Sequence, residues 1–253
     1  MDKEYEKKYH ESEEKNWWFV ARRDAVVRLL DRTDKEKKIL DIGCAGGALI
    51  SDLTNLGFKN VYGLDFSETA VELCHEKDLK NVFVMDAQAP SFEDNSFDII
   101  VASDSLEHLE NDAKALLEWK RILKKNGRLI VFVPAYTFLW SEHDEINHHF
   151  RRYSKRGLQR KLESAGFEIE ALSFWNFYLF FPTALLRIFL NLFRKKNPGS
   201  PQQGQIIKFK PVINAILIAF FKIENRIFRS VGLPVGVSVY ASARKTEGAV
   251  AGP

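Results

Sequence analysis

The sequence predicts an α/β fold in which a mostly parallel sheet carries helices on both faces. From residue 38 onward, short apolar runs alternate with helical stretches, which is the pattern of βαβ units. The first apolar run leads into the glycine-rich segment Gly43-Cys44-Ala45-Gly46-Gly47. A glycine-rich turn after the first strand is typical of nucleotide-binding sheets. We therefore expect a nucleoside-type ligand at the carboxyl edge of this sheet.

The individual elements follow from the spacing of apolar residues. Residues 3–35 are predicted to be helical, because apolar side chains recur at helical spacing between Ala25 and Leu30. A helix at 155–165 is predicted to end before Gly166, and Asn126-Gly127 is interpreted as a turn just before the fifth strand. Strands are expected at 38–42, 61–65, 82–85, 98–103, 128–133, 167–173 and 236–244.

The length of 253 residues suits one domain with additions to its core. We expect its parts to be an N-terminal helical cap (1–36), the core (37–173), an apolar helical insertion (174–234), the last strand (235–245) and a disordered tail (246–253).

The composition argues against several classes of function. A net charge of +3 is too small to indicate a nucleic-acid partner. The two cysteines, Cys44 and Cys74, indicate neither a disulfide framework nor a zinc site. The charged N-terminus has no apolar stretch like that of a signal peptide, and the low cysteine content suits a reducing compartment. We therefore expect a cytoplasmic protein.

The glycine turn does not have the pattern of a dinucleotide site. Such a site has Gly-x-Gly-x-x-Gly, whereas the corresponding positions here are Gly43, Ala45 and Ala48. Asp41 precedes the turn, where its carboxylate would repel a phosphate and attract an ammonium group. This disfavours an NAD-type ligand and favours S-adenosylmethionine, which carries an ammonium, a sulfonium and no phosphate.

Two further aspartates follow the next two predicted strands. Asp65 is placed to bind ribose hydroxyls, and Asp86 is placed to accept a hydrogen bond from an adenine amino group. The alternative is that these aspartates only cap helices. Three aspartates together with the glycine turn favour the ligand site.

Five segments carry a resemblance to a known family, at residues 40–47, 61–67, 84–87, 97–109 and 122–134. In these segments the chain resembles the class I S-adenosylmethionine-dependent methyltransferases. The resemblance implies a Rossmann-like seven-stranded sheet with strand order 3-2-1-4-5-7-6 and an antiparallel last strand. Ala45 departs from the glycine that the family usually has, which puts only the detail of the turn in doubt.

The resemblance also implies roles for particular residues. Ser103 should line the methionine side of the pocket, and Glu107-His108 matches a pair that the family places beside the donor. Packing beneath the site is the alternative for His108. The residues expected to bind S-adenosylmethionine, with S-adenosylhomocysteine as product, are Asp41, Gly43, Cys44, Ala45, Gly47, Asp65, Phe66, Asp86, Ala87 and Ser103.

Methyl transfer is an in-line displacement, so the protein mainly positions the two reactants. An acceptor hydroxyl also needs a base, and the segment 140–153 after the fifth strand supplies candidates. The candidate bases are His143, His148, His149 and His108. Metal ligation by the histidines of this segment stays open, but their spacing matches no standard site and no metal is predicted. A solvated polar loop is the alternative.

The acceptor is expected to contact Trp18, Arg22, Trp140, Arg151, Arg152 and Tyr153. Arg151 and Arg152 would hold a carboxylate or phosphate on it. Tyr9-His10 and the segment 17–23, in which aromatic side chains stand beside arginines, resemble a segment in a subset of the family and fit a lid. Docking of an N-terminal helix on the core is the alternative.

Residues 174–193 and 211–229 are strongly apolar, but Pro182, Arg187 and Asn191 argue against a simple membrane span. Between them, a linker at 197–205 is expected to be mobile. The polar residues predicted to form narrow stripes are Thr183, Arg187, Asn191 and Arg194 in the first segment and Asn214, Lys222, Asn225, Arg226 and Arg229 in the second. The basic residues that flank both segments are Lys195, Lys196, Lys208 and Lys210.

These apolar segments admit several interpretations. The first is an interfacial helical hairpin that lies in anionic lipid at the inner face of the membrane. The others are a wall for a lipid-like acceptor, a homodimer interface, and ordinary packing against the core. The lipid surface is the leading interpretation.

The sequence therefore predicts transfer of a methyl group from S-adenosylmethionine to an oxygen or nitrogen of a small-molecule or lipid-linked acceptor. A binding or scaffold protein without catalysis is the alternative, and an NAD-dependent oxidoreductase is less favoured. No nucleic-acid partner is expected, because the basic run at 151–161 is short.

Overall fold

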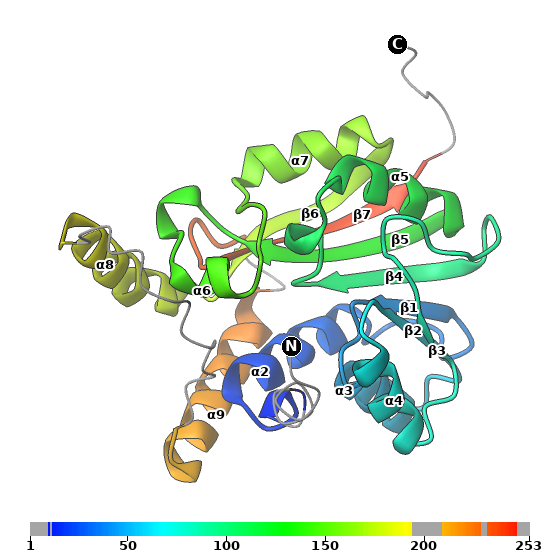
Figure 1. Ribbon diagram of the computed structural model, residues 1–253, viewed down its shortest axis with the longest axis horizontal. Coiled ribbons are helices and arrows are strands. Elements are labelled where there is room, and N and C mark those ends of the chain that lie inside the picture. The colour runs from blue at the N-terminus through cyan, green and yellow to red at the C-terminus, as the bar shows by residue number, and fades with distance from the viewer. Residues whose placement is uncertain (1–9, 11, 194–208, 229–231, 247–253) are drawn as a thin grey trace.

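A seven-stranded sheet forms the centre of the molecule. The computed structural model describes residue 10 and residues 12–193, 209–228 and 232–246. The strands lie in the order β3-β2-β1-β4-β5-β7-β6 (Figure 1). They are β1 (Lys38–Ile42), β2 (Asn60–Asp65), β3 (Val82–Val84), β4 (Phe97–Ser103), β5 (Leu123–Pro134), β6 (Phe167–Trp175) and β7 (Ser238–Lys245). Only β7 is antiparallel to its neighbours, which confirms the predicted order and the direction of the last strand.

The fifth strand is longer than predicted. It begins at Leu123, directly after a helix, and contains Asn126-Gly127. Phe97 pairs with Leu123 and Ile99 pairs with Arg128, so the intervening residues form an irregularity in the ladder. Asn126, with a φ of 59°, lies in this irregularity, so the predicted turn falls inside β5, just before the regular pairing that begins at Arg128, rather than before the strand.

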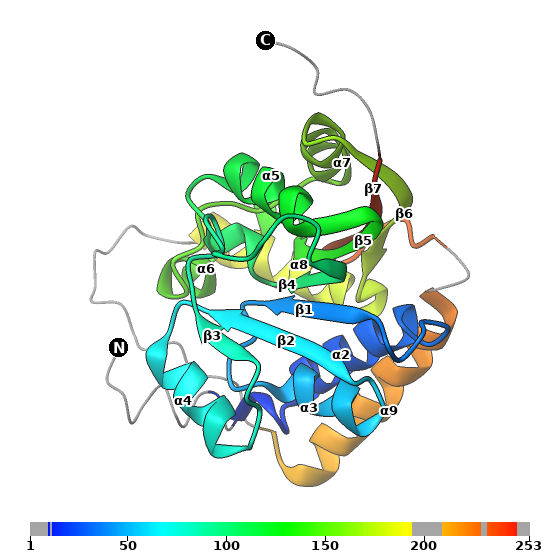
Figure 2. The ribbon, with the colours of Figure 1, turned by 90° about the vertical axis from the view of Figure 1, so that its right-hand side faces the viewer.

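Helices cover both faces of the sheet (Figure 2). Leu116 and Trp119 of α5 and Leu158 of α7 are fully buried against one face. Val26 of α2 and Leu53 of α3 are fully buried on the other. The helices are α2 (Trp17–Leu29), α3 (Ala48–Asn55), α4 (Glu68–Glu76), η1 (Leu106–His108), α5 (Asp112–Ile122), η2 (Thr137–Leu139), α6 (Glu142–Ile146), α7 (Lys155–Ser164), α8 (Phe177–Phe193) and α9 (Pro211–Phe228).

The N-terminal region is not one continuous helix, contrary to the prediction for residues 3–35. The helix breaks before Trp17, because Asn16 adopts an extended backbone and its side chain accepts a hydrogen bond from the Trp18 amide at 3.0 Å. An asparagine at this position is a strong helix N-cap. Most of the region before it, residues 1–9 and 11, lies outside the described residues.

The two apolar segments are helical, as expected, and take different positions. The first helix, α8, projects from the sheet at the left of Figure 1, whereas α9 packs along α2. Within the described residues, neither these nor any other helix combines the length and apolarity that crossing a membrane requires. Of the predicted flanking and stripe residues, Arg194, Lys195, Lys196, Lys208 and Arg229 lie outside the described residues, as do the side chain of Asn191 and the predicted linker at 197–205.

Three polar side chains of α9 contact the rest of the protein. Asn225 is fully buried, accepts from the Trp175 indole Nε1 at 2.8 Å and donates to the Ala21 carbonyl at 2.8 Å. Asn214 accepts from the Trp17 amide at 2.9 Å, and the buried Glu224 accepts from the Phe177 amide at 2.9 Å. These contacts fix α9 to α2 and to the residues where β6 ends and α8 begins, and they leave several of its apolar residues exposed.

Removing the Asn225 amide should destabilise the fold. In Asn225→Ala the Trp175 N–H and the Ala21 carbonyl lose their partners in a buried site, so we expect a loss of about 2–4 kcal/mol in the free energy of unfolding. Urea denaturation measures this loss. The control is Ile216→Ala on the exposed side of the same helix, expected to change stability by less than about 0.5 kcal/mol. Equal effects of the two substitutions would contradict this role of Asn225.

Candidate functional site

The glycine turn between β1 and α3 forms one wall of the candidate site. The amides of Gly43 and Cys44 donate to the Leu64 carbonyl of β2 at 2.8 and 3.0 Å, which ties the turn to the neighbouring strand. Gly43, Ala45 and Gly47 have φ values of 71°, 47° and 75°. The chain thus folds back on itself and presents backbone toward the carboxyl edge of the sheet.

Two of the glycines are required by close packing. A Cβ on Gly43 would lie 2.5 Å from the Ser105 Oγ, and one on Gly47 would lie 2.6 Å from the Leu79 Cδ1. Both positions also have the left-handed backbone that glycine adopts without a steric cost. Ser105 donates to the Ile42 carbonyl at 2.7 Å, so the turn after β1 and the segment after β4 are held together.

Asp41 and Asp65 lie close to this turn. Asp65 accepts hydrogen bonds from the Ala45 and Ser67 amides, both at 2.9 Å, and so shapes the turn as well as facing the site. Asp41 is buried, and this burial, with the nearby Asp65 charge, raises the pKa of Asp41 to about 7. A cationic ligand group would restore the charge of such a carboxylate.

The other predicted donor-binding residues lie along the same edge. The Phe66 ring, beside Asp65, is 82% exposed, which leaves a free aromatic face for a ligand base. Asp86 comes two residues after β3 rather than ending it, and it accepts from the Gln88 amide at 2.8 Å. Ala87 follows Asp86, and Ser103 ends β4, the neighbour of β1. The parallel pairing of β3, β2, β1 and β4 therefore brings the predicted residues to one edge, while their roles stay predictions.

The segment after β5 folds back over η1 and forms the opposite wall. The Phe150 amide donates to the Glu107 carbonyl at 2.9 Å, and Ala135 forms an isolated bridge with Tyr153. The rings of His108 and His149 consequently lie edge to face with their centroids 4.5 Å apart. The predicted polar loop thus packs on η1, the short helix that follows β4.

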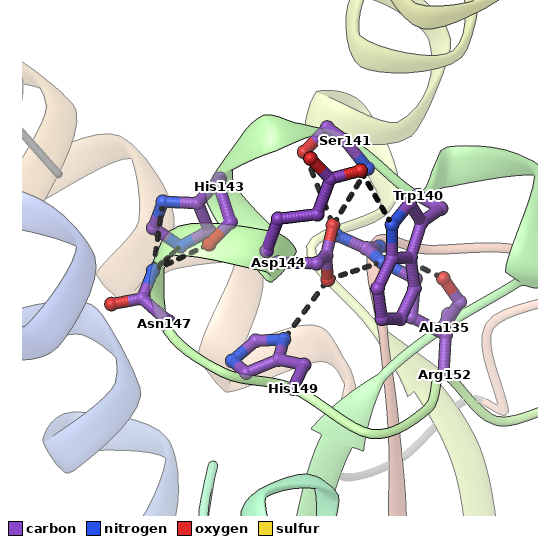
Figure 3. Close-up of polar contacts among 9 residues, drawn as sticks. Ala135, Trp140, Ser141, His143, Asp144, Asn147, His149 and Arg152 are labelled. Atoms are coloured by element: carbon purple, nitrogen blue, oxygen red, sulfur yellow. Dashed lines mark hydrogen bonds and ion pairs between the residues drawn. The ribbon is translucent and has the colours of Figure 1, made fainter. Parts of the chain in front are cut away.

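Asp144 organises this second wall (Figure 3). It is fully buried and accepts from His149 Nδ1 at 2.9 Å, from Arg152 Nε at 2.8 Å and from the Ser141 amide at 2.9 Å. Burial alone would raise the pKa of Asp144, but the hydrogen bonds from His149 and Arg152 hold it well below its ordinary value. Asp144 is therefore an ionised anchor that orients the His149 ring.

The candidate bases differ in their surroundings. Burial, with the neighbouring His149, lowers the pKa of His108 to about 4, and burial also lowers the pKa of His143. Burial, with the nearby Asp104, raises the pKa of the Glu107 carboxyl well above its ordinary value. The His108 side chain is exposed all the same, so its role as the base stays a prediction.

Several residues predicted to contact an acceptor have internal partners. Arg152 pairs with Asp144 and donates to the Ala135 carbonyl at 3.1 Å. Arg151 forms an ion pair with Asp112 at 3.1 Å, and the buried Tyr153 hydroxyl donates to the same carboxylate at 2.9 Å. These contacts argue for structural roles.

The remaining predicted residues of the loop are less engaged. The half-buried Trp140 indole donates to Glu145 at 3.4 Å, and His148 has a φ of 55° at the end of the short helix α6. Both lie on the segment that forms the second wall.

Arg22 is part of the core and not of an exposed lid. Its guanidinium is 3% exposed, lies 4.1 Å from the centroid of the Trp175 ring, donates to the Ser238 hydroxyl at 2.8 Å and pairs with Asp104 at 3.2 Å. Trp18 packs edge to face on Trp175 with centroids 5.2 Å apart. The docking alternative for the N-terminal aromatic segment is therefore the one that the structure shows.

The sequence analysis missed three residues that build the site. Asp104 and Asp144 anchor the two arginines, and Ser238 meets Arg22 from the last strand. Only Asp144 had a local signal, since Ser141-x-x-Asp144 forms a capping box at the start of α6.

Comparisons with known proteins agree with this geometry. The family described as "Methyltransferase domain" matches residues 40–131. A probable S-adenosylmethionine-dependent methyltransferase of Mycolicibacterium smegmatis is 30% identical over 166 residues, which cover 62% of each chain. The ubiquinone biosynthesis O-methyltransferase of Pelagibacter ubique is 32% identical over 113 residues, covering 43% of this chain and 47% of its own. The matches thus span less than two thirds of the length of these relatives.

A solved structure shows the same fold over nearly the whole chain. It is the methyltransferase chain of a Haloferax volcanii complex with the Trm112 methyltransferase activator, with a TM-score of 0.63 at 16% identity. The similarity covers 97% of this chain and 96% of that one.

The charge of Asp144 should contribute to stability in a pH-dependent way. Because the folded-state pKa is depressed, the contribution is complete above the unfolded pKa of about 3.9 and is lost as pH falls further. We expect Asp144→Asn to cost about 3 kcal/mol in the free energy of unfolding at pH 7 and progressively less below about pH 4. Urea denaturation at several pH values measures this difference.

The control is Asp52→Asn. Asp52 pairs with Arg23 at 2.7 Å but is 44% exposed, so its loss should cost less than about 1 kcal/mol. A difference between wild type and Asp144→Asn that does not change with pH would exclude the anchoring charge as its cause.

Proposed function

We propose that this chain, a member of the class I S-adenosylmethionine-dependent methyltransferases, transfers a methyl group from S-adenosylmethionine to an oxygen or nitrogen of a small or lipid-linked acceptor. The observation that carries the proposal is the glycine turn with Asp41 and Asp65 at one edge of a sheet with the family's strand order.

The residues around the turn suit each part of the donor. The buried Asp41 would face the ammonium and sulfonium end, where a positive charge favours its ionised form. Asp65 would accept from the ribose hydroxyls, and the exposed Phe66 ring offers a stacking surface for adenine. Asp86 and Ala87 would bound the adenine edge, and Ser103 the methionine side. No phosphate-binding cation is needed.

The reaction requires little chemistry from the protein. The acceptor atom attacks the methyl carbon in line with the C–S bond, and the sulfonium leaves as a neutral thioether. The two walls, formed by the glycine turn and by the segment 135–153, would hold the reactants in contact and exclude water. His143, His148 and His149 lie on the second wall and are the candidates for accepting a proton from an acceptor hydroxyl.

The outer surfaces of α8 and α9 support a lipid-linked acceptor. Leu185 of α8 is 73% exposed and Ile216 of α9 is 61% exposed. The other large apolar residues exposed on these helices are Tyr178, Phe181, Leu186, Ile188, Phe189, Val212, Ile213, Phe220, Ile223 and Ile227. An apolar surface of this extent on a protein is a binding surface rather than a solvated one.

The charge on these helices favours an anionic lipid surface. Lys210 and Arg226 are exposed and Arg187 is half-buried, whereas the acidic residue of α9, Glu224, is buried against the N-terminus of α8. Apolar residues flanked by basic ones are the pattern of helices that lie in the membrane interface. The competing partner for this surface is a second copy of the chain. Flotation with vesicles distinguishes the lipid surface from such a homodimer.

Loss of the Asp65 charge should weaken donor binding. We expect Asp65→Asn to raise the Kd for S-adenosylhomocysteine about ten- to a hundredfold, because a charge-assisted hydrogen bond contributes about 1.5–3 kcal/mol. Isothermal titration measures the Kd, with NADH as the comparison ligand, which should not bind. Glu68→Gln, an exposed neighbour, is the matched control and should leave the Kd unchanged. Unchanged affinity in Asp65→Asn would reject the ribose contact, and binding of NADH in place of S-adenosylhomocysteine would reject the proposed function.

Membrane binding should depend on the exposed residues of α8 and α9. We expect the protein to float with vesicles that contain phosphatidylglycerol, and the double substitution Leu185→Glu with Ile216→Glu to abolish flotation. Leu117→Glu on α5, which is 56% exposed but lies elsewhere, is the control and should float normally. Failure of the wild type to float, together with a dimer that the double substitution dissociates, would assign the surface to a second copy of the chain.

A further inference from the structure

Three side chains outside the proposed S-adenosylmethionine pocket form a compact group that could ligate a metal ion. One ligand atom each of Glu107, His108 and His149 lies within 4.8 Å of the others. We propose that these residues bind a divalent first-row transition-metal ion, and that this ion binds the oxygen of a hydroxyl acceptor during methyl transfer. The second half of this inference rests on the proposed function, whereas the binding of the ion does not.

Glu107 points to a ligand that the described residues do not supply. Its side chain is 1% exposed, and its Oε2 atom has no hydrogen-bond partner among the described residues. A buried carboxylate oxygen without a partner is costly, so native structures rarely leave one. An ion bound to this oxygen would remove the cost.

Both histidines are held in the way that metal-binding histidines are held. His149 donates from Nδ1 to Asp144 at 2.9 Å, which leaves its Nε2 atom as a lone-pair donor. His108 forms a hydrogen bond to the backbone of Asn147 through its ring, so it also keeps one nitrogen for a ligand. A carboxylate or backbone carbonyl on the far nitrogen is the usual outer partner of a metal-bound imidazole.

The donor set selects the kind of ion. Two imidazoles and one carboxylate suit Zn²⁺, Co²⁺, Mn²⁺ or Fe²⁺, whereas Mg²⁺ and Ca²⁺ prefer oxygen ligands. Bonds of about 2.1 Å place tetrahedral ligands about 3.4 Å apart, so small side-chain rotations would close the group. Three protein ligands leave a coordination position open for a substrate oxygen.

The charges nearby are consistent with an anionic acceptor. Asp104 pairs with Arg22, and Asp144 pairs with Arg152, so each of these ion pairs is neutral. With Glu107 ionised, a divalent ion would leave one net positive charge, which an alkoxide or phenolate would neutralise. The site also lies near the donor, because Ser105, two residues before Glu107, donates to Ile42 at the start of the glycine turn.

The chemical step is balanced without a redox partner. The acceptor hydroxyl, bound to the ion through its oxygen, loses its proton to water because the ion lowers the pKa of that hydroxyl. The oxygen electron pair forms the new O–CH₃ bond, and the electron pair of the broken C–S bond returns to sulfur. The products are a methyl ether and a neutral thioether. The ion thus specifies a hydroxyl as the acceptor among the oxygen and nitrogen groups proposed above.

Titration of the metal-free protein with Co²⁺ tests the site, because bound Co²⁺ absorbs visible light in a coordination-dependent way. We expect a Co²⁺ band that Zn²⁺ displaces and that excess Mg²⁺ does not. His149→Ala and Glu107→Gln should each weaken Co²⁺ binding at least a hundredfold, and Asp144→Asn about ten- to a hundredfold. His75→Ala on α4, whose ring contacts the Val82 carbonyl, is the matched control and should bind Co²⁺ normally.

Binding of S-adenosylhomocysteine, measured on every variant, shows that the protein is folded. A wild type that binds S-adenosylhomocysteine but gives no Co²⁺ band would overturn the inference and leave the proposed function intact. A band that persists in both His149→Ala and Glu107→Gln would also overturn it. A Co²⁺ band without binding of S-adenosylhomocysteine would keep the metal site and reject its role in methyl transfer. If His149→Ala does not fold, Glu107→Gln decides.

Discussion

The buried guanidinium of Arg22 connects more of the structure than any local contact. It comes from α2, pairs with Asp104 after β4 and donates to Ser238 of β7. Its face lies against the rings of Phe132 and Trp175, so the aromatic surface takes the place of further hydrogen bonds. A buried cation is tolerated only with such compensation, which means that the N-terminal helix, the sheet and the site-bearing segment after β4 must assemble together.

The parts that local sequence determines were predictable. Apolar runs of strand length and the glycine turn gave the strands and the edge where Asp41 and Asp65 lie, because the carboxyl ends of parallel strands meet at one edge. The family resemblance supplied the strand order. The differences from the prediction are at Asn16, which caps a helix where a continuous helix was expected, and at Asn126, which lies inside a strand where a turn before the strand was expected. A cap and a bulge both use the same short polar side chains as a turn does.

The second wall of the site could not be predicted in this way. Its histidines were noted, but their orientation depends on Asp144, and the meeting of His149 with His108 depends on how the chain returns to η1. Likewise, the pattern of α9 predicted a polar stripe but not what this stripe contacts. The structure shows that Asn225 faces the protein, because Trp175 and Ala21, far away in sequence, provide its partners. Long-range pairing of polar groups decides both cases.

The docking of α9 through its polar side has a consequence for the unity of the domain. Asn225 of the insertion joins α2 to the indole of Trp175 at the end of β6, and that indole covers Arg22. An appendage that could be excised would share few buried polar contacts with its host, and α9 shares several. We therefore expect α9 and the sheet to unfold together, so that a force on the outer surface of α9 would be transmitted to the loop that carries Asp104 and Glu107.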